Sequence, residues 1–286
     1  MSNAACIEAA TQAELPGISG PALTQAEFSA ACRWLYETAG ISLSPHKKAL
    51  VASRLAKRLR HRNLASFGDY LAIVTGGEDP AETQIALDLL TTNETYFFRE
   101  PAHFEFLREA VLPARARGRP FRVWSAACST GEEPYSIAMV LADVLGANGP
   151  WEIVSSDIST RVMEIARRGC YPMSATDRIP PELLRQFALR GVGDCEGTFM
   201  VDEPLRKRVR IVPINLNATL PGIGEFDVVF LRNVMIYFDS QTKRAVVSRI
   251  LARLRPGGHL FVSHSESLHG IDDTLLALRP SVYRKH

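Results

Sequence analysis

Residues 123–136 read VWSAACSTGEEPYS, and this stretch predicts the architecture of the chain. The mostly apolar run 121–126 suits a β-strand, and residues 134–145 carry the apolar spacing of an amphipathic helix. Small residues and a single glycine, Gly131, connect the two. A strand, a tight turn and a helix in this order open an α/β sheet that binds a nucleotide-like ligand at its strand ends.

The turn lacks the G-x-G-x-x-G fingerprint of diphosphate-binding loops, and Glu132 and Glu133 follow its glycine. Two carboxylates at a helix start suit the helix dipole but repel phosphate. The pattern therefore favours a nucleoside that carries positive charge. S-adenosylmethionine, with its sulfonium and α-ammonium groups, fits this description, and we expect it as the cofactor, with S-adenosylhomocysteine as its product.

The composition is that of an ordinary globular protein, since 46% of the 286 residues are hydrophobic and 22% are charged. The net charge of +2 is too small for a nucleic-acid-binding or membrane-binding surface over the whole molecule. Five cysteines without a C-x-x-C pair predict neither disulfides nor a metal site. Without a signal-peptide pattern or a run of membrane-spanning length, we expect a cytoplasmic monomer that does not insert into membranes.

Before residue 91 the chain carries only helical patterns. Residues 1–21 are rich in small residues and are expected to form a disordered arm. Helices are predicted at about 25–40, beginning with a capping box of Thr24 and Glu27, and at about 45–61, 66–76 and 81–90. Residues 22–90 are therefore expected to form a small all-α domain.

The second of these helices is strongly basic, because residues 47–62 contain seven lysines or arginines and no acid. Arg54, Lys57 and Arg58 share one helix face opposite the leucines. This face is either an ordinary solvated surface or a docking site for an acidic partner, a Glu-rich helix or a phosphate backbone. The absence of acids argues against pairing within the surface, and the absence of interleaved aromatic residues weakens the nucleic-acid option.

Residues 91–120 join the helical domain to the first strand and begin with TTNETYFFREP, residues 91–101. Asn93, Thr95 and Arg99 are hydrogen-bonding groups, and a guanidinium holds a carboxylate through two parallel bonds. A cofactor derived from methionine has such a carboxylate. We therefore interpret residues 91–120 as a linker and a lid, with an ordinary linker as the alternative.

From residue 121 strand and helix patterns alternate. Strands are predicted at 122–126, 152–156, 209–214, 226–231, 259–263 and 282–284, and helices at 134–145, 159–168, 181–187 and 240–254. This order predicts an α/β domain with a doubly wound parallel sheet over 121–286. A turn-rich stretch with β-like flanks predicts a small antiparallel β-subdomain inserted at about 188–212. Exposed strands of this kind can accept a peptide strand, and the alternative is an insertion without a binding role.

Polar residues follow several predicted strands, where ligands of such sheets bind. Asp157 stands 26 residues after Gly131, and it either accepts hydrogen bonds from ribose hydroxyls or caps the next helix. Asn215 and Leu216 follow the third long strand and could hold an adenine by its edge and face. Further candidate residues of the cleft follow the fourth strand: Arg232, Asn233 and Tyr237. For Tyr237 the alternative is a core aromatic residue whose hydroxyl reaches solvent.

Several separate segments resemble the chemotaxis receptor glutamate O-methyltransferases, the CheR family. They are TTNETYFFRE (91–100), VWSAACSTGEEPYS (123–136), SSDIS (155–159), INLN (214–217) and FLRNVMIYFD (230–239). The order of a helical domain and an α/β domain with an inserted β-subdomain fits as well, and the resemblance covers the chain from about residue 22 to its end. It implies a class I S-adenosylmethionine-dependent methyltransferase fold.

The resemblance also implies roles for residues at matching positions. Cofactor binding is assigned to Asn93, Thr95, Arg99, one of Glu132 and Glu133 with Glu133 preferred, Asp157, Asn215, Leu216, Arg232 and Asn233. Arg54, Lys57 and Arg58 would face the methylation helices of the receptor. In some members the β-subdomain holds a tethering peptide from the receptor C-terminus. Ser125 departs from many methyltransferases, which have an acid at its position.

The implied reaction is methyl transfer to glutamate side chains of methyl-accepting chemoreceptors. A glutamate carboxylate is ionised at neutral pH and needs no general base, so catalysis consists chiefly of orientation and desolvation. Arg99 and Tyr237 are the candidate catalytic residues. The alternatives are a nucleic-acid-binding methyltransferase-like protein that uses the basic helix on phosphates, and a cofactor-binding regulator without catalysis.

Overall fold

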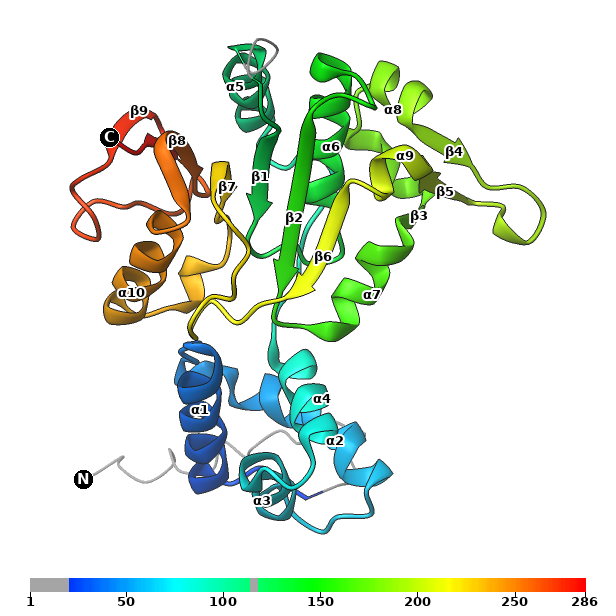
Figure 1. Cartoon of the computed structure of the whole chain (residues 1–286). Helices are drawn as coiled ribbons and strands as arrows, with labels where there is room; N and C mark the ends of the chain where they lie inside the picture. The colour runs from blue at the N-terminus through cyan, green and yellow to red at the C-terminus, as the bar shows by residue number, and fades with distance from the viewer. Residues whose placement is uncertain (1–20, 114–117) are drawn as a thin grey trace, which may run out of the picture.

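The computed structural model describes residues 21–113 and 118–286, so the arm expected at 1–21 lies almost wholly outside the described residues. Figure 1 shows a helical N-terminal domain below a larger domain that is built around a twisted sheet. The chain passes between the domains through residues 91–100, which contain neither helix nor strand.

The N-terminal domain consists of α1 (Gln25–Ala39), the 3-10 turn η1 (Pro45–Lys47), α2 (Lys48–His61), α3 (Phe67–Gly76) and α4 (Pro80–Leu90). The predicted capping box at the start of α1 is present, with Glu27 N donating to Thr24 Oγ1 and Thr24 N donating to the Glu27 carboxylate. The apolar helix faces meet in one core that includes Leu35, Leu55 and Tyr70. The four predicted helices are confirmed close to their expected bounds.

The larger domain is built on a seven-stranded sheet in the order β6-β2-β1-β7-β8-β10-β9. Its strands are β1 (Phe121–Ser125), β2 (Trp151–Asp157), β6 (Val209–Pro213), β7 (Phe226–Phe230), β8 (Leu254–Phe261), β9 (Leu276–Arg279) and β10 (Val282–Arg284). Strands β6, β2, β1, β7 and β8 run parallel, whereas β10 and β9 complete one edge in antiparallel pairs. The sheet is therefore mixed, and not purely parallel as predicted, because the chain returns as a hairpin beside β8.

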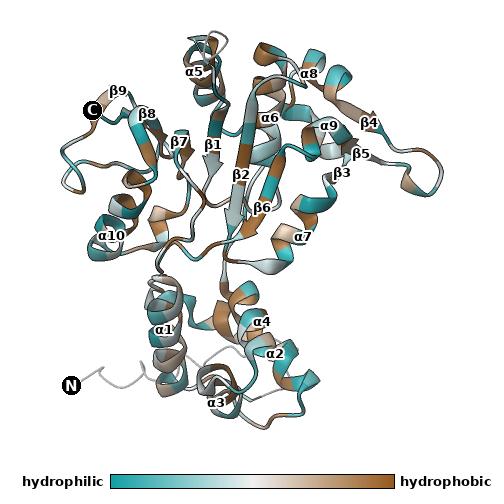
Figure 2. Ribbon diagram, viewed as in Figure 1, coloured by the Kyte–Doolittle hydropathy of each residue, from teal (hydrophilic) through white to brown (hydrophobic). Residues whose placement is uncertain are grey.

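Helices cover both faces of this sheet. They include α5 (Pro101–Val111), α6 (Glu132–Leu145), α7 (Thr160–Arg168) and α10 (Ser240–Leu251). Val123 of β1 packs into a cluster with residues of α5 and α6, whereas its neighbour Trp124 packs into a cluster with residues of α10. Successive strand residues point to opposite faces, so the two clusters lie on opposite sides of the sheet, as a doubly wound fold requires. Figure 2 shows hydrophobic segments in β2, which lies between them.

A second sheet, three-stranded and antiparallel, is inserted after α7 in the order β3-β5-β4. The insertion contains β3 (Cys170–Pro172), η3 (Met173–Arg178), α8 (Pro181–Phe187), β4 (Ala188–Arg190), η4 (Gly193–Cys195), β5 (Thr198–Val201) and α9 (Glu203–Arg206). These bounds differ at both ends from the expected 188–212. β3 starts the insertion at Cys170, and β6 belongs to the main sheet because it pairs with β2. A strand of three residues is too short to give a recognisable periodicity.

Asp88, near the end of α4, connects the two domains. Its carboxylate accepts hydrogen bonds from Thr160 N, Thr160 Oγ1 and Arg161 N at 2.9, 2.8 and 3.2 Å. The first N–H groups of a helix have no partner within the helix, so a side chain of the helical domain caps α7 of the α/β domain.

Within residues 21–113 and 118–286 there is no helix with the length and hydrophobicity that a bilayer crossing requires.

Candidate active site

The loop between β1 and α6 turns sharply beyond the end of the strand. Gly131 has a φ of +101°, and a Cβ at this position would lie 2.7 Å from the Tyr171 hydroxyl oxygen. Glycine is therefore required here, both for the backbone conformation and for the close approach of the neighbouring side chain. Ser129 N donates to Asp157 Oδ2 at 2.8 Å, which holds the loop against the end of β2.

A cavity of about 450 Å³ opens beside this loop, at the carboxyl ends of the parallel strands. Its volume lies in the range of pockets that hold small-molecule ligands and cofactors. Nine residues singled out in the sequence line it: Asn93, Thr95, Arg99, Glu133, Asp157, Leu216, Arg232, Asn233 and Tyr237. The fold thus brings together residues from the linker and from the ends of four strands.

Glu132 and Asn215, both within the described chain, do not line the cavity. The Glu132 carboxylate accepts a hydrogen bond from Thr130 Oγ1 at 2.6 Å. Asn215 Nδ2 donates to Thr38 O of α1 at 2.6 Å, so its amide faces the helical domain. Neighbouring helix residues differ by about 100° in direction, which is why the structure separates two glutamates that the sequence could not separate.

Glu133 and Arg232 form a buried ion pair in the cavity wall. Glu133 Oε2 accepts from Arg232 Nη1 at 2.8 Å, and Glu133 Oε1 accepts from Ser125 Oγ at 2.8 Å. Arg232 Nη2 also donates to Arg99 O at 2.5 Å and lies 3.1 Å from Glu100 Oε2. Burial raises the pKa of Glu133, and the nearby guanidinium of Arg232 opposes that rise. Ser125 thus helps to orient an acid that comes from the next helix.

Asp157 is 7% exposed at the end of β2 and serves two purposes. Its Oδ1 atom accepts from Ser159 N at 3.0 Å just before α7, and its Oδ2 atom accepts from Ser129 N. Burial raises the pKa of Asp157, while these N–H donors lower it. A carboxylate oxygen can accept more than one hydrogen bond, so the group that fixes the loop can still accept from a ligand hydroxyl.

Residues 93–96 and Arg99 line the cavity, and this segment contacts both the β1–α6 loop and the inserted subdomain. Ser129 Oγ donates to Asn93 O at 2.8 Å. The guanidinium groups of Arg99 and Arg178 lie 5.5 and 4.5 Å from the ring centroid of Tyr96, within the range of cation–π contacts. Because Arg178 belongs to η3, the inserted subdomain contacts the segment that was predicted to act as a lid.

The helical domain supplies part of the cavity wall, which the sequence did not predict. Lys47 and Leu50, from η1 and α2, line the cavity. Ser42 N donates to Tyr237 O at 2.8 Å, so the backbone of the candidate catalytic tyrosine is held by the other domain. No local pattern could indicate this contact, because the two residues are far apart in the chain.

The basic face of α2 is partly paired inside the helical domain. Arg58 forms a salt bridge of 2.5 Å with Glu82 of α4, whose side chain is 2% exposed. Arg54 Nη1 donates to the carbonyl oxygens of Leu90 and Thr91, each at 3.0 Å. The expectation of an unpaired basic face is therefore wrong for Arg58, because its acid comes from a neighbouring helix. Lys57 is exposed.

The cavity offers what an adenosine-based cation requires: buried carboxylates in Glu133 and Asp157, an apolar wall that includes Leu216, and a guanidinium in Arg99. The fold and this site define a class I S-adenosylmethionine-dependent methyltransferase. The chain belongs to the CheR methyltransferase family. Residues 26–91 match the model of the CheR methyltransferase all-alpha domain, and residues 93–282 match that of the CheR methyltransferase SAM binding domain.

Curated relatives extend over most of the chain. It is 44% identical over 252 residues to the chemotaxis protein methyltransferase of Salmonella typhimurium, with 87% of this chain and 86% of the relative covered. It is 43% identical over 266 residues to that of Escherichia coli, with 92% and 91% covered. Chemotaxis protein methyltransferase 2 of Pseudomonas aeruginosa is 43% identical over 262 residues, with 91% and 93% covered.

The two neighbouring glutamates allow a matched test of the cavity assignment. We expect Glu133→Gln to weaken binding of S-adenosylhomocysteine about 10- to 100-fold, because a charge-assisted hydrogen bond contributes about 1.5–3 kcal/mol. Glu132→Gln, whose side chain faces away from the cavity, is expected to leave the affinity unchanged. Isothermal titration calorimetry measures both. An equal loss in the two variants, or none in Glu133→Gln, would contradict the assignment.

Proposed function

We propose that this protein transfers the methyl group of S-adenosylmethionine to glutamate side chains of methyl-accepting chemoreceptors and forms glutamyl methyl esters in chemotaxis adaptation. The names of the curated relatives support the role in chemotaxis. The observation that carries the proposal is the cavity itself. It combines an acidic wall for the cofactor with Arg99 and Tyr237, two groups that can position a carboxylate.

The chemistry requires little from the protein beyond orientation. A glutamate side chain is ionised at neutral pH, so an oxygen of its carboxylate attacks without a general base. The bound cofactor supplies a methyl group on a sulfonium, and its carbon–sulfur bond breaks to a neutral thioether as the carbon–oxygen bond of the ester forms. Alignment of the two partners and removal of water from the carboxylate therefore account for the catalysis.

Within the cavity, each cofactor contact follows from the chemistry of the side chain. Asp157 suits the ribose hydroxyls, Glu133 suits the α-ammonium group, and Leu216 suits one face of the adenine. The remaining polar groups of the wall then serve the rest of the cofactor: Asn93, Thr95, Arg232 and Asn233. Asn215 is left out of this set because its amide is used by α1.

Arg99 and Tyr237 are the residues to which we assign positioning of the reacting carboxylate. The guanidinium of Arg99 can hold a carboxylate bidentately, either that of the cofactor or that of the substrate. Tyr237 belongs to η5 (Met235–Tyr237), and the bond from Ser42 fixes its backbone at the cavity wall. Because the backbone of Tyr237 is already fixed, less conformational freedom has to be lost when its side chain orients the acceptor.

We propose that the partners are the cytoplasmic helices of the receptors, that the protein acts as a cytoplasmic monomer, and that it uses two surfaces. One is the exposed part of α2 around Lys57, which suits acidic helices. The other is the small sheet, where Leu189 and Val192 are 58% and 79% exposed. β4 is an edge strand of this sheet, and an edge strand can pair with an added strand such as a tethering peptide from the receptor C-terminus.

Radiolabelled methyl transfer tests the proposed reaction. The purified protein, methyl-labelled S-adenosylmethionine and membranes that contain chemoreceptors are expected to give receptor-bound label that mild alkali releases as methanol, because an ester is formed. Receptors with alanine in place of the helix glutamates provide the control. Label that resists alkali would contradict the proposal, as would steeply salt-dependent binding to DNA or RNA without any ester.

Substitution of the two positioning residues tests their roles in the reaction. We expect Arg99→Ala and Tyr237→Phe each to lower methyl transfer by about tenfold or more, because each variant loses a hydrogen bond to a charged group. Arg167→Ala, at an exposed ion pair on α7, provides the control. The rate at saturating receptor and cofactor is the measurement, and full activity in both variants would remove the assigned roles.

Charge reversal tests the docking surface on α2. We expect Lys57→Glu to raise the KM for the receptor, more at low than at high ionic strength, and to leave the affinity for the cofactor unchanged. Arg284→Glu is the control, because Arg284 on β10 is exposed as well and lies outside α2. Lys57 is the better probe than Arg58, whose replacement would leave the buried Glu82 without its partner. An unchanged KM at low salt would exclude the docking role.

A further inference from the structure

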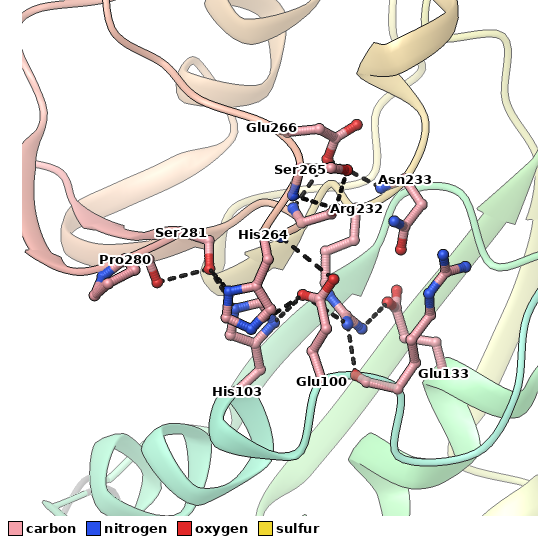
Figure 3. Close-up of polar contacts among 12 residues, drawn as sticks. Glu100, His103, Glu133, Arg232, Asn233, His264, Ser265, Glu266, Pro280 and Ser281 are labelled. Carbon is pink, nitrogen blue, oxygen red and sulfur yellow. Dashed lines mark hydrogen bonds and ion pairs between the residues drawn. The ribbon is translucent and has the colours of Figure 1, made fainter.

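Behind the wall of the cofactor cavity, one carboxylate and two histidines converge. Figure 3 shows Glu100 and His103 at the start of α5 facing His264, which follows β8. One potential ligand atom from each of the three residues lies within 4.8 Å of the other two. Glu100 Oε2 is 3.3 Å from His103 Nδ1 and 3.8 Å from His264 Nε2. His264 is far from Glu100 and His103 in the chain, so the sequence predicted no metal site.

The contacts of Ser281 allow the tautomer of His103 in which Nδ1 carries no proton. Ser281 Oγ lies 2.8 Å from His103 Nε2 and 3.4 Å from His264 Nδ1, and it also contacts Pro280 O at 2.6 Å. When its proton goes to Pro280 O, the Ser281 oxygen accepts from an Nε2–H of His103. His103 Nδ1 is then an unprotonated acceptor.

The His103 side chain is 1% exposed, and its Nδ1 atom has no hydrogen-bond partner among the described residues. Glu100 Oε2 forms an ion pair with Arg232 Nη2 at 3.1 Å. A nitrogen lone pair and a carboxylate oxygen thus face each other at 3.3 Å in a buried place, beside the Arg232 guanidinium, and a metal ion can bridge them.

The separations suit a tetrahedral metal ion. Zinc bonds of about 2.0–2.2 Å to nitrogen and oxygen place two tetrahedral ligands about 3.4 Å apart. The 3.3 Å between His103 Nδ1 and Glu100 Oε2 already matches this value. His264 is the ligand that has to move, and its side chain is 51% exposed, so its rotation meets little resistance. With a metal on Nδ1, the other ring N–H of His103 donates to Ser281 Oγ, 2.8 Å away, as metal-binding histidines commonly do.

We propose that His103 Nδ1, His264 Nε2 and a Glu100 carboxylate oxygen form a binding site for a divalent transition metal of the Zn²⁺ type, with solvent at the fourth position. Imidazole and carboxylate ligands in this number are typical of zinc sites with one open position. Arg232 also contacts Glu100, at 3.1 Å, but keeps its bonds to Glu133 and to Arg99 O when Glu100 turns to a metal. The guanidinium therefore still has an acidic partner.

Metal titration of the full chain, prepared without a polyhistidine tag, tests the site. We expect one Zn²⁺ per chain by calorimetry, and a Co²⁺ complex with the absorption of nitrogen and oxygen ligands and no thiolate band. His264→Ala removes an exposed ligand and leaves the core intact, and it should weaken the affinity by at least about tenfold, since even loss of an outer partner costs 10- to 100-fold. Ser281→Ala, which removes only that outer partner, should weaken it by about tenfold.

His269→Ala provides the matched control, because His269 is an exposed histidine of the same C-terminal loop. It should bind Zn²⁺ as the unaltered protein does. The proposal is overturned if no stoichiometric binding occurs, if His264→Ala binds with unchanged affinity, or if both histidine variants lose affinity equally. A thiolate band with Co²⁺ would also overturn it, since the cation would then be held by cysteines.

Discussion

The buried ion pair between Glu133 and Arg232 is the interaction on which the rest of the site depends. It joins the start of α6 to the end of β7, and Arg232 extends it to the linker through Arg99 O. Loss of one partner of a buried pair costs about 3–5 kcal/mol, because the other charge stays in a place without water. The pair therefore fixes the relative positions of three segments that surround the cofactor cavity. Its acidic member also places a carboxylate in the wall of the cavity.

The second constraint is the joint between the domains, which makes the helical domain part of the site. Asp88 caps α7 across the joint, and Ser42 holds the backbone of Tyr237. Lys47 and Leu50 complete the cavity wall on the same side. Movement of the helical domain would change the cavity as well as any docking surface on α2. The proposed docking surface on α2 and the cofactor cavity are therefore linked through one set of contacts between the domains.

Most elements of the fold were predictable, since they depend on local patterns. The capping box at Thr24 and the strand–turn–helix at 121–145 are examples in which the structure agrees with the elements expected from the sequence. The failures have a common physical cause. β3 is three residues long and is recognisable only through its pairing with β5, and the acid that pairs with Arg58 lies on another helix. Nine of the residues expected at the site do line one cavity, because strand ends converge in any sheet of this type.

The sequence by itself determined the class of fold, the family resemblance and the acidic, glycine-poor loop that favours a cationic nucleoside. These depend on side-chain periodicity and on the chemistry of neighbouring residues. Only the tertiary structure decided that Glu133 and not Glu132 faces the cavity, and that Asn215 turns to α1. It also brought Glu100, His103 and His264 together. Such contacts depend on which elements pack against each other. The sequence pattern of one segment does not specify which distant residues its side chains will contact.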